Sequence, residues 1–301
     1  MTVASHSKAS QLAINGVQME FVSINGGART TIVDRNDAAN RGTYEKCDEN
    51  VAPGLVYVDI QVQMQPSATD LDTLLPLIGL EEGLTDEFTI GDFVTAGQLL
   101  PEFTVVIDRV AKVHTYTNCV VSSAVFQCQK GSSPLQLSLR IVGVTETEGA
   151  AGTFPALSLT CGPPLAMNQL VLTLRSATRQ ADRIAIAIDH KVQREFNNST
   201  TATHLTPSDR VITLACSTPY VAANTDLYTQ PGPTTQDIDG DVGTAVFTNG
   251  GLSTSFSFAN LKELPQSPSV LQAQEIRLPV NMKAYGTAST ASLIVTNDAT
   301  P

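Results

Sequence analysis

The sequence predicts a mainly β protein whose antiparallel strands are divided between two related domains. Three observations lead to this prediction: apolar and polar residues alternate along several segments, the chain is longer than one average domain, and its composition favours strands. The 301 residues include 35 Thr and no Trp, and only 16% are charged. Because Thr and Val are enriched in strands, this composition favours β structure over coiled coils or disorder.

The first clear strand lies at 55–65. Its apolar face holds Val56, Val58, Ile60, Val62 and Met64. Its other face is polar and mostly amide, with Asp59, Gln61, Gln63 and Gln65. One apolar and one polar face are typical of an antiparallel strand that packs on one side and meets water on the other.

A short helix is predicted over 70–78, directly after this strand. Thr69 can cap it, and its apolar residues recur at helical spacing: Leu71, Leu74, Leu75 and Ile78. Pro76 should kink or shorten the helix, and Gly79 should end it. We expect the apolar side of this helix to pack against a sheet.

Two long loops are predicted, at 80–102 and 229–251. The first has six acidic and no basic residues, among them Glu81, Glu82, Asp86, Glu87 and Asp92. The second is rich in Gly, Pro, Thr and Asp, and includes Asp237, Asp239 and Asp241. Loops longer than about 12–15 residues are usually functional or ordered by a partner. Both are therefore candidates for contact with a neighbouring molecule, and surface insertions are the alternative.

Three more segments alternate as strands do, at 135–141, 183–189 and 275–283. In the last of them, Pro279 cannot donate a ladder hydrogen bond. It should therefore lie at a sheet edge or a bulge.

Weak internal repetition suggests two related domains. Residues 103–108 resemble 183–189 because both end on Ile-Asp. Residues 55–65, followed by Pro and Thr-Asp-Leu, resemble 211–217 with the same residues after it. We interpret these as domains 1–150, with an N-terminal arm at 1–15, and 151–301.

The charge excludes several partners. With 29 acidic and 18 basic residues the net charge is −11, and no basic cluster exists to hold nucleic-acid phosphates or an anionic membrane. The first eleven residues contain no apolar run, so we expect no secretory signal. Five Cys without a C-x-x-C spacing indicate reduced, cytosolic thiols.

No motif indicates catalysis, a metal or a cofactor. In the Asp237–Asp241 run, a calcium loop would need Glu where Thr248 stands. The four His residues lack zinc-ligand spacing. Asp189 and His190 should point to opposite faces of a strand, and no nucleophile motif accompanies them. We expect neither cofactor nor metal, and no enzymatic activity.

The chain resembles the major tail tube proteins of long, non-contractile-tailed, siphovirus-type bacteriophages. The resemblance is one of pattern and order over most of residues 50–300. The segments that carry it are Gly54–Gln61, Pro66–Gly79, Leu100–Asp108, Cys119–Ala124, Leu135–Gly143, Arg183–Arg194, Thr206–Leu214 and a strand pair near 275–296.

The resemblance implies two tail-tube-like antiparallel β-sandwich or β-barrel domains, each with a short flanking α-helix, and a structural role in the virion. Such proteins assemble in the host bacterial cytoplasm into stacked rings that form the hollow tail. A chain with two domains would form a trimeric, pseudo-hexameric ring, with a hexamer as the alternative. Its partners would be further copies of itself, the tape-measure protein, and the tail terminator and tip proteins. Genomic DNA would be only a transient, non-sticky cargo, and no membrane would be involved.

Within such a tube, the polar face of strand 55–65 is the candidate channel lining, with Asp59, Gln61, Gln63 and Gln65. The strand has no base that would hold passing phosphates, although this face could equally look outward. The acidic loop residues are candidates for contacts between subunits. Two other classes remain: another virion β module (a tail terminator, decoration or adhesin-like binding protein) and a β-rich enzyme. The missing Trp argues against an adhesin.

Overall fold

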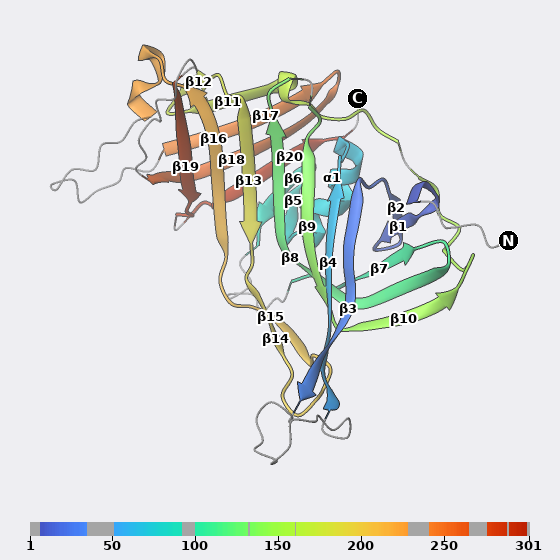
Figure 1. Cartoon of the computed structure of the whole chain (residues 1–301). Helices are drawn as coiled ribbons and strands as arrows, with labels where there is room; N and C mark the ends of the chain where they lie inside the picture. Colours follow the sequence, from blue (N-terminus) through green and yellow to red (C-terminus); the bar gives the residue numbers. More distant parts are fainter. Residues whose placement is uncertain are drawn as a thin grey trace.

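A computed structural model (Figure 1) describes residues 7–34, 51–91, 100–131, 133–159, 161–227, 241–264, 276–287 and 289–299. The strands of the first half are β1 (Gln11–Ile14), β2 (Val17–Met19), β3 (Ser23–Asp34), β4 (Val51–Met64), β5 (Leu80–Leu84), β6 (Glu87–Ile90), β7 (Phe103–Asp108), β8 (Lys112–Gln129), β9 (Gln136–Gly143) and β10 (Thr145–Ala150). Those of the second half are β11 (Leu170–Leu174), β12 (Ala177–Arg179), β13 (Arg183–Asp189), β14 (Val192–Glu195), β15 (His204–Pro207), β16 (Val211–Pro219), β17 (Asp241–Asn249), β18 (Leu252–Leu264), β19 (Arg277–Ala284) and β20 (Leu293–Asp298). The helical elements are α1 (Ala68–Leu77) and 3-10 turns η1 (Ser7–Ala9), η3 (Met167–Gln169) and η4 (Ala222–Leu227).

The strands form a two-layered antiparallel β-sandwich, as the sequence predicts. The front layer, called the main sheet here, has the order β3-β4-β9-β8-β13-β16-β19, with the end of β18 beyond β19. The rear layer has the order β12-β11-β17-β18-β20-β6-β5. A smaller sheet, β2-β1-β7-β8-β10, adjoins the first half.

Two long strands each belong to two sheets: β8 joins the smaller sheet to the main sheet, and β18 joins the rear layer to the main sheet. β8 pairs with β7 and β10 near its start and with β9 and β13 further along. β18 pairs with β17 and β20 near its start and with β19 at its end. One continuous core therefore extends through both halves of the chain, from Val62 and Phe126 to Phe256 and Val280.

The alternating segments are strands with one buried face. Every second side chain is buried along β13 and β19, over residues 58–64 of β4, and over residues 136–141 of β9. Pro279 pairs with Ser217 of β16, whereas β18 reaches only residues 281–284 on the other side. Pro279 therefore lies at a local edge, where its missing N–H removes no ladder hydrogen bond.

Helix α1 begins two residues earlier than predicted because Ser67, not Thr69, is its N-cap. The Ser67 hydroxyl accepts from the Asp70 N–H, and the Asp70 carboxylate accepts from the Ser67 N–H at 2.9 Å. These reciprocal bonds form a capping box. Pro76 lies in the last turn, and Gly79 follows the helix with φ +91°. The short η4 takes the corresponding place after β16.

Both predicted loops contain strands. Residues 80–90 form the β5–β6 hairpin, which turns at Asp86 with φ +62°. Phe88 and Ile90 are buried, and the gain from burying them explains why an acidic segment is ordered. In 229–251, residues 241–249 form β17. In the predicted N-terminal arm, residues 11–14 are β1.

The strand pairings of the first half recur in the second. Seven strand pairs of the first half each have a counterpart in the second. β1–β2 corresponds to β11–β12, β1–β7 to β11–β17, β7–β8 to β17–β18, β8–β10 to β18–β20, β3–β4 to β13–β16, β4–β9 to β16–β19, and β8–β9 to β18–β19. The match of β4 with β16 agrees with the repetition in the sequence. The match of 103–108 with 183–189 was wrong, because β7 corresponds to β17 and β13 to β3.

Candidate assembly surfaces

The open face of the main sheet carries a row of amide side chains. Gln61 and Gln63 are exposed on β4, and Gln65 is exposed just after it. The Ser23 hydroxyl donates to Gln63 Oε1 at 3.0 Å. Neighbouring strands extend the row with Asn25, Gln127, Gln136 and Asn281, which share this face by register. The structure therefore brings the predicted amides into a wide polar surface.

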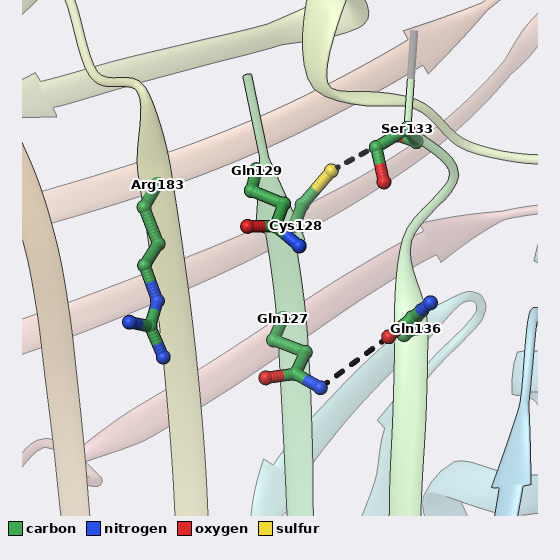
Figure 2. Close-up of a pocket in the computed structure, with 6 residues that line it drawn as sticks. All are labelled: Gln127, Cys128, Gln129, Ser133, Gln136 and Arg183. Carbon is green, nitrogen blue, oxygen red and sulfur yellow. Dashed lines mark hydrogen bonds between the residues drawn. The ribbon is translucent and has the colours of Figure 1, made fainter. Parts of the chain in front are cut away.

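A small cavity lies at one end of the main sheet, where the last residues of β8 meet the first residues of β9 and β13 (Figure 2). Gln127 of β8 donates to Gln136 Oε1 of β9 at 3.4 Å, and Arg183 lies on β13, on the other side of β8, opposite Gln129. The cavity measures about 170 Å³, less than the roughly 300 Å³ or more of typical ligand sites. We interpret it as a gap at the junction of the halves.

Asp59 differs from the predicted lining residues because it is mostly covered. It forms ion pairs with Arg140 at 2.8 Å and with Arg194 at 3.2 Å, and its side chain is 17% exposed. Burial raises the pKa of Asp59, but hydrogen bonds and charge from these two arginines outweigh it and hold the pKa below its ordinary value. Although β4 itself has no base, β9 therefore supplies one at this position.

The β14–β15 hairpin of the second half covers Asp59. Arg194 of this hairpin stacks over the Tyr57 ring at 4.7 Å. The backbone of Val56 donates to the Thr200 carbonyl at 2.7 Å. Beside these contacts lies a second apolar cluster, made of Leu100, Val120, Val142, Ala202 and Leu205. In Figure 1 this hairpin and the distal β3–β4 hairpin lie together below the sheet.

The acidic candidates do not all occupy similar places. Glu81 and Glu82 are exposed on β5, whereas Asp86 and Glu87 are half-buried at the hairpin turn. Asp241 begins β17 and accepts a hydrogen bond from Arg175 at 2.6 Å, within its own subunit. The remaining candidates lie outside the described residues: Asp92, Asp237 and Asp239.

Sequence reasoning missed the open strand edges. In the described part of the chain, β3 has no strand partner besides β4, and β10 none besides β8. The β3 edge is partly covered by side chains, because Ala28 N–H donates to Glu146 at 3.2 Å and the Gly26 carbonyl accepts from Arg109 at 2.6 Å. The last residues of β18 pair with β19 on one side. Unpaired edges are templates for adding a strand from another molecule.

A metal site and a membrane-spanning helix each place requirements on the described residues. Within the described ranges, no group of three or more His, Cys, Asp or Glu residues could hold a metal ion. Over the same ranges, no helix has the length and apolar character needed to cross a membrane.

Antiparallel strands in two packed layers, with one open polar face, define an all-β sandwich protein. The family model for the phage tail tube protein matches residues 19–284. The chain therefore belongs to the phage tail tube family, and it is a structural component of the virion tail. A search of curated proteins finds no match.

Proposed function

We propose that three copies of this chain close into a ring, and that stacked rings form the hollow conduit for genome ejection. One observation carries the proposal: the β8–β13 pairing joins two four-stranded units inside one chain. The units are β3-β4-β9-β8 and β13-β16-β19-β18. In this proposal they represent the two predicted tube domains, 1–150 and 151–301.

The internal pairing supplies a template for contacts between copies. Because β3 corresponds to β13 and β18 to β8, we expect the β3 edge of one copy to lie beside the β18 end of the next, as β13 lies beside β8. The residues of β18 that would correspond to 124–129 follow Leu264 and lie outside the described residues. The template spans residues 183–189 against 123–129. Repeating it around an axis would leave no open main-sheet edge, which is a common solution to the edge problem.

The expected channel has a size suited to DNA. Three copies of an eight-stranded sheet would give ~24 strands; at ~4.8 Å per strand the circumference is ~115 Å and the backbone diameter roughly 37 Å, before strand tilt widens it. A hexamer of this chain would double that diameter. The trimer is therefore the tighter fit to a DNA duplex.

The open polar face would line this channel in our proposal, with Gln61, Gln63 and Gln65 towards the cargo and Asp59 at its covered end. The amides carry no charge that would hold passing phosphates, whereas the bases that share this face, Arg29, Arg140 and Arg183, would each add a contact unless a carboxylate pairs them, as Asp59 pairs Arg140. The exposed Glu81 and Glu82 would lie on the rear layer, away from the channel. In our proposal they and the other acidic candidates lie between subunits or between rings. The tape-measure protein would occupy the lumen, with terminator and tip proteins at the ends, and assembly would take place in the host cytoplasm.

Electron microscopy with sedimentation analysis of the purified chain tests this proposal. We expect ring-shaped particles of three copies and open-ended tubes at high concentration. Rings of six copies would refute the trimer. Isolated rings that never stack would favour a tail terminator, and a stable monomer at all concentrations would refute the tube function.

A further inference from the structure

The distal part of the β3–β4 hairpin, called the β3–β4 arm here, has a counterpart within the same chain. This counterpart is the β14–β15 hairpin, which lies between β13 and β16 in the sequence. In the same way, the β3–β4 arm lies between the first part of β3 and the last part of β4. The registers agree residue by residue: Ile32↔Pro53, Val33↔Ala52 and Asp34↔Val51 against Val192↔Pro207, Gln193↔Thr206 and Arg194↔Leu205. Both hairpins therefore continue equivalent strand pairs.

The two hairpins differ sharply in what covers them. Leu205 is only 7% exposed and packs in the second apolar cluster with Val120 and Val142. Its counterpart Val51 is 43% exposed, and Ile32, the counterpart of Val192, is 69% exposed. The β14–β15 hairpin lies on the neighbouring half of its own chain, whereas the β3–β4 arm has no further half beside it.

The surface that would receive the arm follows from the same equivalence. In the first half, Asp59, Val142 and Val120 lie side by side on the open face. In the second half, the same positions are Thr213, Lys283 and Lys262. Tyr285 follows at the next open-face position, 40% exposed, with Lys283 Nζ 5.4 Å and Lys262 Nζ 5.8 Å from its ring centre.

We propose that the β3–β4 arm of one copy packs on the Lys262–Lys283–Tyr285 surface of the next copy in the ring. This rests on the proposed ring. Tyr285 and the lysine stems offer apolar area to Ile32 and Val51. The charges are also complementary. Within the chain, the hairpin contributes the base Arg194 and the sheet the acid Asp59; between copies, the arm would contribute the acid Asp34 and the sheet the base Lys283. Each arm thus fastens one subunit to its neighbour.

Cross-linking tests this contact. In a background with Cys47 and Cys161 replaced by Ser, Val51→Cys with Lys283→Cys should give covalent dimers and trimers, but no larger species, with a short bismaleimide. The matched control is Val33→Cys with Lys283→Cys, because Val33 is similarly exposed, at 54%, but lies on the other side of the arm. The control should cross-link at least fivefold less.

The outcomes separate this inference from the proposed function. Rings that form normally without preferential cross-linking of the Val51 pair would refute the arm contact and leave the ring proposal standing. A chain that forms no rings would refute both. Covalent species beyond the trimer would contradict the closed ring of three.

Charge reversal gives a second, independent measurement. Lys262→Glu with Lys283→Glu should raise the protein concentration needed for half-maximal assembly at least tenfold, and adding Asp34→Lys should recover part of that loss. Lys130→Glu, which changes an exposed lysine on the β8–β9 turn, is the control and should assemble normally. Equal effects of control and double variant would refute the electrostatic part of the contact.

Discussion

Removing the Arg194 guanidinium should loosen the β14–β15 hairpin from the main sheet. The ion pair with Asp59 joins side chains that are only 20% and 17% exposed, and a hydrogen bond to a charged group contributes about 1.5–3 kcal/mol. The stacking on Tyr57 adds about 0.5–1 kcal/mol. Asp59 keeps its bond to Arg140, and Met would retain part of the packing. We therefore expect Arg194→Met to lower the free energy of unfolding by about 2 kcal/mol.

Thermal unfolding at pH 7 measures this effect. For a chain of 301 residues, a loss of about 2 kcal/mol corresponds to a Tm decrease of about 3 °C. Arg29→Met, which changes an exposed arginine on the same face, should shift Tm by less than about 1 °C. Asp59→Asn combined with Arg194→Met should cost less than the sum of the single changes, because the two side chains interact. A decrease below about 1 °C for Arg194→Met, or full additivity, would refute the proposed anchoring.

Three further perturbations follow from buried groups. Asn297 has no exposed surface; its side chain accepts from the Thr254 hydroxyl at 2.6 Å and donates to the Ala68 carbonyl of α1. Asn297→Val should therefore lower the free energy of unfolding in urea by about 2–4 kcal/mol; an unchanged free energy would contradict this network. Gly26→Ala should impair folding in a solubility assay, since its Cβ would lie 2.1 Å from the Asp59 carbonyl oxygen at φ +96°. Burial lowers the pKa of His190, so the unfolded chain binds more protons below pH ~6.5. Stability should fall as pH decreases from 6.5, and His190→Asn should flatten that slope in urea titrations.

The sequence was sufficient for the strands whose two faces differ. Alternation in β4 and β13 reflects burial on one side, so the pattern itself records the sheet. It was insufficient for residues 80–90, where six acids in the wider segment hid the short Phe88 and Ile90 alternation that defines β6. Local composition could not reveal that the rear layer offers β20 as a pairing partner for this hairpin.

The candidate surface was only partly predictable for a similar reason. Gln61 and Gln63 are exposed because of their own strand, and alternation identifies them. Asp59 has the same position in that alternation, yet Arg194, which is 135 residues away in sequence, covers it. Pro53 of the β3–β4 arm and Pro207 of the β14–β15 hairpin occupy equivalent positions and indicate that the two hairpins are related. The sequence alone does not reveal this, because the equivalence depends on the strand register.

The β8–β13 junction also has a consequence for counting. Since one chain carries both four-stranded units, their mutual contact forms at a fixed effective concentration and cannot be lost by dilution. Any closed ring of whole chains must then contain an even number of units, so rings of five or seven units are excluded by connectivity alone. In the proposed ring, one kind of unit boundary would lie within a chain and the other between chains, so only the second would depend on protein concentration.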